Sequence, residues 1–205
     1  MTVLTALIAL NVVVTLLGFR ALRAGGAAAE RFLFIPAQVA HGQNLIGMLL
    51  AHVSHGSVMH LVFNMLALVS FGDGVLGVLG PERFLLVYVV AGLGSDLVVF
   101  VLRRSDPAYR CLGASGSVFG IVAAAVVLDP STSIVMLFVP VPIPGPLFLI
   151  GYGVISVILI ARQRRDGISH EGHLGGALLG LVVTALIAPR GLEPLMHWIT
   201  HRLGG

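Results

Sequence analysis

The chain has 205 residues, of which 57% are hydrophobic and only 10% are charged. Soluble domains carry about 25% charged residues, so this composition excludes an ordinary soluble protein and predicts a polytopic membrane protein. All twelve basic residues are arginine and the formal net charge is only +3, so we expect no nucleic-acid partner. The single cysteine, Cys111, excludes an internal disulfide and a cysteine-based metal cluster, and we interpret it as a packing residue.

Six apolar runs follow one another along the chain, each close to the length of a membrane-crossing helix. A helix rises about 1.5 Å per residue, so roughly 20 residues cross a hydrocarbon core of about 30 Å. The predicted spans are residues 2–19, 57–71, 83–102, 113–128, 147–161 and 171–188. The first run lacks the basic start of a signal peptide, so we keep it as a span. These runs predict an all-α polytopic membrane protein that forms one domain over residues 1–205.

The segments between the runs differ in character. Residues 24–43 predict a loop at the membrane interface that can include short helices, and residues 73–81 predict a glycine-rich loop. Prolines alternate over residues 138–147, which forbids a regular helix and predicts an extended loop. The tail, residues 189–205, is predicted to be interfacial or disordered.

Two residues able to perform acyl chemistry open two of the later spans. Ser115 lies between glycines at the start of the fourth span, and His173 lies at the start of the sixth. The two spans run in the same direction, so both side chains are expected at the same membrane depth. A serine is a weak nucleophile without an adjacent base, and histidine is the usual one. The alternative is that a serine flanked by glycines only lets helices pack closely.

Glycines spaced four residues apart form a smooth stripe on each of these two spans, a pattern that permits close approach of membrane helices. The glycines expected to pack the helices are Gly113, Gly116, Gly120, Gly172, Gly176 and Gly180. Such packing would bring the hydroxyl of Ser115 within hydrogen-bond reach of His173. The glycines could equally serve stability alone.

His60 and Asn64 lie four residues apart in the second span and therefore share one helix face. Polar side chains inside a membrane segment are candidates for function. A tetrahedral intermediate needs donors for its oxyanion, and His60, Asn64 and the backbone N–H of Ser115 could supply three. A plain hydrogen bond between helices is the alternative.

Three segments together resemble the signature sequences of the rhomboid intramembrane serine proteases: residues 57–65 (SVMHLVFNM), 113–120 (GASGSVFG) and 170–176 (HEGHLGG). The likeness covers about residues 32–188. It implies a compact six-helix rhomboid-like bundle, a catalytic dyad of Ser115 and His173, and no metal or cofactor. It also implies that His60 and Asn64 line the oxyanion hole and that Phe119 packs on the catalytic histidine. The Trp-Arg pair that usually follows Gly-Gln in the family is absent after Gln43.

The function implied by the resemblance is hydrolysis of peptide bonds in or next to transmembrane segments, with single-span membrane proteins as substrates and lipid as surroundings. A non-catalytic rhomboid-like binding module is one alternative, although both Ser115 and His173 are present. A transporter coupled to protons or a metal is another, using Asp96 and the histidines. We expect Asp96 to form a buried hydrogen bond within its own span. We expect a multi-pass protein of the bacterial cell membrane.

The distribution of arginines and the family resemblance predict opposite orientations in the membrane. Nine arginines follow the first, third and fifth spans: Arg20, Arg23, Arg31, Arg103, Arg104, Arg110, Arg162, Arg164 and Arg165. The positive-inside rule therefore places the Ser115 end of the fourth span in the cytosol. The resemblance to bacterial rhomboids implies the reverse, with a site that opens outward, and we favour that orientation.

Overall fold

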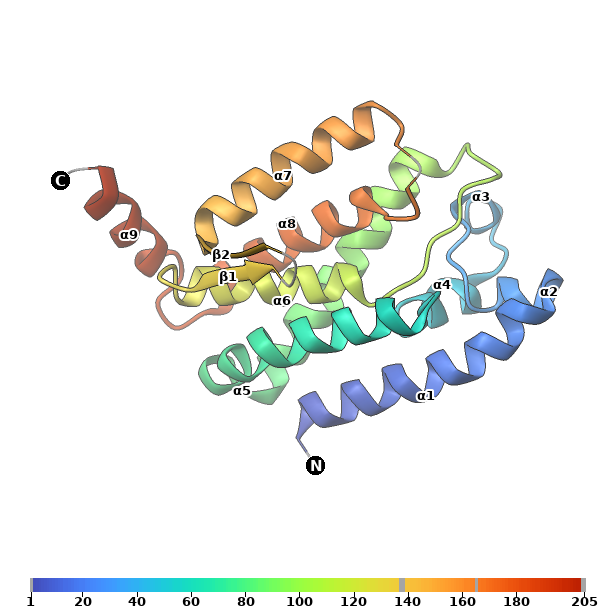
Figure 1. Cartoon of the computed structure of the whole chain (residues 1–205), viewed down its shortest axis with the longest axis horizontal. Helices are drawn as coiled ribbons and strands as arrows, with labels where there is room; N and C mark the ends of the chain where they lie inside the picture. The colour runs from blue at the N-terminus through green and yellow to red at the C-terminus, as the bar shows by residue number, and fades with distance from the viewer. Residues whose placement is uncertain (1, 137–138, 165, 204–205) are drawn as a thin grey trace.

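The computed structural model describes residues 2–136, 139–164 and 166–203 and is mainly helical (Figure 1). Its elements in chain order are α1 (Val3–Ala24), α2 (Gly26–Glu30), α3 (Pro36–Val39), α4 (Leu45–Ala51), α5 (Val58–Arg103), α6 (Ser115–Leu128), β1 (Ser133–Met136), β2 (Val139–Pro144), α7 (Gly145–Ala161), α8 (His170–Ile187) and α9 (Glu193–Leu203). The short helices α2 to α4 lie between α1 and α5 in the chain, where the sequence predicted an interfacial loop that can include short helices. Phe138 and Arg165 of the predicted loops, and the last two residues of the tail, lie outside the described residues.

Large apolar side chains on the surface indicate that lipid surrounds the molecule. Among the described helices, α1, α5 and α8 are long and apolar enough to cross a membrane, and α6 and α7 are shorter apolar helices. Leu17, Ile150 and Leu186 are 60%, 64% and 79% exposed. Such side chains form an unfavourable surface in water, whereas lipid tails are as apolar as leucine. The chain is a mainly helical integral membrane protein.

Helix α5 consists of two helical halves that meet at Gly80, where φ is 76° and ψ is 169°. Glycine adopts this conformation without a steric penalty, and Pro81 follows as the first residue of the second half. His52 precedes α5 and pairs with Asp96 near its end, so the chain reverses direction between them (Figure 1). The predicted loop over residues 73–81 was wrong, because one glycine makes the reversal and the residues before it stay helical.

Helix α6 forms the centre of the bundle, and most of its residues are buried between α5 and α8. A Cβ atom at Gly176 would overlap the backbone of Gly116, and one at Gly180 would overlap the backbone of Gly120. A Cβ atom at Gly120 would also meet the side chain of Ala91 on α5. Helices α6 and α8 therefore touch backbone to backbone, which is possible only where Cβ atoms are absent.

Strands β1 and β2 and helix α9 lie at the far end of α6 from Ser115 (Figure 1). Strands β1 and β2 form an antiparallel hairpin in which Ile134 pairs with Ile143. Pro140, Pro142 and Pro144 lie in β2, so this part of the backbone is extended as predicted, although the pairing with β1 was not foreseen. The predicted loop ends too late, because Pro146 lies in the first turn of α7, a position that proline tolerates. The tail folds into helix α9, where the sequence predicted an interfacial or disordered segment. Glu193 in its first turn and Arg202 in its last turn complement the helix dipole.

Candidate active site

Three of the predicted site residues lie in the first turns of different helices. Ser115 is the first residue of α6, His60 lies in the first turn of α5, and His173 lies in the first turn of α8. Two of these helices have serine N-caps, since Ser57 accepts from the backbone N–H of His60 and Ser169 accepts from that of Gly172. The caps fix where each helix starts and therefore where the functional side chains point.

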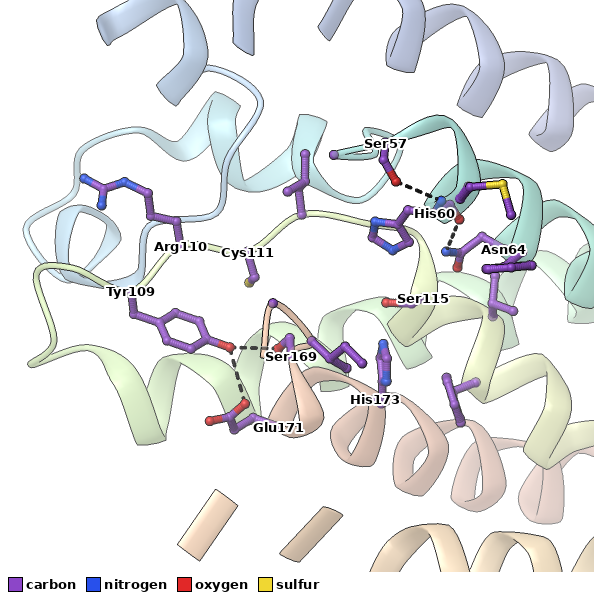
Figure 2. A pocket seen from close by; sticks show the side chains of 18 of the residues that line it. Ser57, His60, Asn64, Tyr109, Arg110, Cys111, Ser115, Ser169, Glu171 and His173 are labelled. Carbon is purple, nitrogen blue, oxygen red and sulfur yellow. Dashed lines mark hydrogen bonds between the residues drawn. The ribbon is translucent and has the colours of Figure 1, made fainter. Parts of the chain in front are cut away.

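These residues line one cavity of about 810 Å³, together with Asn64 and Phe119 (Figure 2). Figure 2 shows the side chain of Ser115 between the rings of His60 and His173. Within the described residues, the hydroxyl of Ser115 makes no hydrogen bond to His173. Catalytic hydrogen bonds are often long without substrate and tighten when it binds.

Gly113 provides the space in which His60 approaches Ser115. Its φ of +136° is rarely adopted by residues with a side chain. A Cβ atom there would lie 2.7 Å from Cε1 of His60 and 3.5 Å from Oγ of Ser115. Gly113 was predicted to pack helices, but it precedes α6 and borders the site. Gly172, also predicted to pack helices, faces the side chain of Ser95 on α5.

Phe119 stacks on the ring of His173, with ring centres 4.5 Å apart and planes 19° apart. Tyr152 of α7 also stacks on Phe119, with ring centres 4.5 Å apart. The Tyr152 hydroxyl is 2.6 Å from Nδ1 of His173. Sequence reasoning did not select Tyr152. The available signal was a tyrosine between two glycines in an otherwise apolar run.

A backbone carbonyl of the same helix holds Asn64, and His55, which is hydrogen-bonded to α1, contacts His60. The Nδ2 group of Asn64 donates to the His60 carbonyl at 2.9 Å, which uses one of its two N–H groups. His55 meets the His60 ring edge-on at 4.9 Å, and Thr15 of α1 hydrogen-bonds Nδ1 of His55 at 2.9 Å. His55 is fully buried and was not predicted as a site residue.

The end of the cavity away from Ser115 and His60 is polar. Arg103 forms an ion pair with Glu171. The Tyr109 hydroxyl lies 2.9 Å from the Ser169 hydroxyl and 3.3 Å from Glu171 (Figure 2). Burial raises the pKa of the Tyr109 phenol above its ordinary value. This network joins the end of α5 to the start of α8 and so holds the segment that carries His173.

Burial also raises the pKa of the Cys111 thiol, to about 12. Because the thiolate is the reactive form, this cysteine is a poor nucleophile. It packs beside Phe34, with which it forms an isolated antiparallel bridge.

Asp96 has a partner outside its own helix, so the expected hydrogen bond within the span was wrong. Its Oδ2 lies 2.7 Å from Nε2 of His52, in the segment before α5. The described residues contain no group of three or more His, Cys, Asp or Glu placed to hold a metal ion. The pair connects the interfacial segment to the second half of α5.

Comparison with known proteins identifies the family. The Rhomboid domain profile matches residues 41–190. The chain is 34% identical over 141 residues to the mouse presenilin-associated rhomboid-like protein, mitochondrial, which covers 65% of this chain and 36% of that protein. It is 33% identical over 187 residues to the zebrafish presenilin-associated rhomboid-like protein A, mitochondrial, which covers 86% of this chain and 45% of that protein.

A third relative is the rhomboid protease GluP of Bacillus subtilis, 32% identical over 140 residues, covering 66% of this chain and 24% of that protein. The matches thus span less than half the length of each of these relatives. Two of the three are named mitochondrial, so the expected bacterial cell membrane is not supported. The resemblance read from the three sequence segments is confirmed, and this chain belongs to the rhomboid family.

Proposed function

We propose that this chain is an intramembrane serine protease that hydrolyses peptide bonds in or next to transmembrane segments. The observation that carries the proposal is the meeting of Ser115 and His173 in one cavity, at the first turns of two helices packed through glycine. A serine beside a histidine is the pairing that nucleophilic acyl transfer requires. The name of the Bacillus relative, a rhomboid protease, supports the same activity.

In the proposed reaction Ser115 Oγ attacks the substrate carbonyl carbon while His173 takes the hydroxyl proton. His173 then gives that proton to the leaving amine, and the acyl group stays on Ser115. A water molecule attacks the acyl carbon in the second half, again giving its proton to His173. Ser115 recovers the proton when the carboxylic acid leaves.

Three donors are proposed to stabilise the oxyanion. The backbone N–H of Ser115 belongs to the start of α6, where helix N–H groups have no intrahelical acceptor. Asn64 keeps a second Nδ2 proton after donating to the His60 carbonyl. The imidazole of His60 adds a third, positioned by His55 behind it. The helix dipole of α6 favours negative charge at the same point.

The proposed membrane arrangement has six crossings in a single domain over residues 1–205. The two halves of α5 account for two crossings, and α1, α6, α7 and α8 for the others. Single-span membrane proteins are the proposed substrates, and lipid surrounds the bundle. The cavity has an apolar side formed by Met59, Phe63 and Val118, which suits a substrate segment leaving the bilayer.

The test uses purified protein in liposomes with a single-span membrane protein as substrate. We expect Ser115→Ala and His173→Ala each to reduce cleavage by more than about 10³-fold while the protein stays folded. Matched controls are Ser105→Ala and His41→Ala, because both residues are exposed and lie outside the cavity. Retained cleavage in either site variant would refute the dyad. Substrate binding without cleavage by the unaltered protein would favour the non-catalytic binding module.

A further inference from the structure

Tyr152 contacts the proposed catalytic histidine from a helix that carries none of the three signature segments. Its hydroxyl oxygen lies 2.6 Å from Nδ1 of His173, a short hydrogen bond across the contact between α7 and α8. Phe119 stacks on both rings, so the three aromatic side chains form one continuous assembly. A tyrosine serving only as packing would not need its hydroxyl at a ring nitrogen.

A neutral imidazole carries its proton on one nitrogen and a lone pair on the other. If Nδ1 carries the proton, it donates to the Tyr152 oxygen, and Nε2 has a lone pair available to take the proton of Ser115. If Tyr152 donates to Nδ1 instead, Nε2 carries the proton and cannot act as a base. The direction of this one hydrogen bond therefore decides whether His173 is competent.

We infer that Tyr152 is a positioning residue for the proposed reaction: its hydroxyl accepts from Nδ1–H of His173 and so keeps Nε2 free for Ser115. This inference rests on the proposed function. It assigns to a tyrosine on α7 the orienting role that a carboxylate has in a serine triad. Unlike a carboxylate, a hydroxyl can also donate, so the surroundings of Tyr152 must favour the accepting direction.

Two neighbours favour that direction. The hydroxyl of Ser156, one helical turn further along the same face of α7, is fully buried, interacts with the Tyr152 side chain and has no other hydrogen-bond partner within the described residues. It is an acceptor available for the Tyr152 proton, which leaves the Tyr152 oxygen to accept from His173. Phe148, one turn before Tyr152, stacks on the tyrosine ring with centres 5.9 Å apart and limits its rotation.

The location of Tyr152 links the histidine to the position of α7. Within its described length, α7 buries only Gly145, Pro146 and Ser156, so few contacts hold it in the bundle. An outward movement of α7 would withdraw the Tyr152 hydroxyl from His173. Acylation is then expected only after a substrate has passed α7 and α7 has returned to the position in which Tyr152 contacts His173.

The first test is Tyr152→Phe, which keeps the aromatic ring and removes the hydroxyl. We expect kcat to fall about 10- to 100-fold with little change in KM, because proton transfer is affected and substrate binding is not. Tyr88→Phe is the matched control, since Tyr88 is buried in the core outside the cavity. It should leave kcat unchanged. An unaltered kcat in Tyr152→Phe would overturn the inference.

A second measurement reads the histidine directly and does not depend on cleavage. Imidazole nitrogen chemical shifts in ¹⁵N-histidine-labelled protein report which nitrogen is protonated, and His173→Ala identifies the signals of His173. We expect the Nδ1–H form in the unaltered protein and a gain of the Nε2–H form in Tyr152→Phe. Identical shifts in both proteins would overturn the inference whether or not the protein cleaves. The expected shifts in a protein that cleaves nothing would instead refute the proposed function.

Discussion

The glycine contact between α6 and α8 leads to a quantitative prediction for Gly176→Ala. A Cβ atom at Gly176 would lie 2.8 Å from the Cα of Gly116 and closer still to its carbonyl oxygen. Carbon atoms in contact are about 3.5–4.0 Å apart, so the two helices must separate by about 1 Å. Overpacking of this kind typically costs about 1–3 kcal/mol of folding stability.

The same shift acts on the site, because α6 carries Ser115 and α8 carries His173. A misplacement of about 1 Å between reacting groups can reduce a rate about 10²-fold. We therefore expect Gly176→Ala to lose both stability and kcat, measured by thermal unfolding in detergent and by peptide cleavage.

The matched control is Gly153→Ala on α7, where a Cβ atom meets nothing within 4 Å. Alanine in a helix is favoured over glycine by about 0.5–1 kcal/mol, so this variant should be as stable as the unaltered protein or slightly more stable. If Gly176→Ala keeps both the stability and the rate of the unaltered protein, the close contact of α6 with α8 is not what aligns the site.

Three further predictions concern the surroundings of the site. His60→Ala and Asn64→Ala should lower kcat more than they raise KM, by up to about 10²–10³-fold for loss of one oxyanion donor, as steady-state kinetics will show; unchanged rates would make them packing groups. Cys111, whose half-buried thiol has its pKa raised to about 12, should resist a maleimide at pH 8 in the folded protein and react after denaturation; rapid labelling when folded would contradict the raised pKa. Phe71→Ala should raise cleavage of membrane substrates but not of a small soluble peptide. Phe71 and Phe148 pack against the same buried cluster, so loss of the Phe71 side chain loosens the contact of α7 with the bundle. Equal effects on both substrates would argue against substrate entry past α7.

Much of the helical layout could be predicted because hydropathy dominates a chain of this composition. The run that contains His173 reads as a span from its apolar length alone, and α8 is long and apolar enough to cross a membrane. The position of His173 at a helix start also follows from local sequence, since Ser169 is a typical N-cap. Local features of this kind need no knowledge of how the helices pack.

Features set by the packing of distant segments could not be predicted. Asp96 finds His52, which lies 44 residues earlier, only once α5 has reversed at Gly80. The sequence around Gly80 reads as a loop because glycine and proline are common there, yet a single positive φ angle makes the turn. Tyr152 contacts His173 because of how α7 packs against α8. The periodicity of the apolar run does not predict the position of one helix relative to the other.

The central claim is that Ser115 is an activated serine and His173 is the base that activates it. A fluorophosphonate tests this most directly, because it modifies serines that a base has made nucleophilic. We expect a single adduct on Ser115, located by mass spectrometry of proteolytic fragments, and no adduct in His173→Ala. An adduct on Ser117 or Cys111 instead, or an undiminished Ser115 adduct in His173→Ala, would contradict the account.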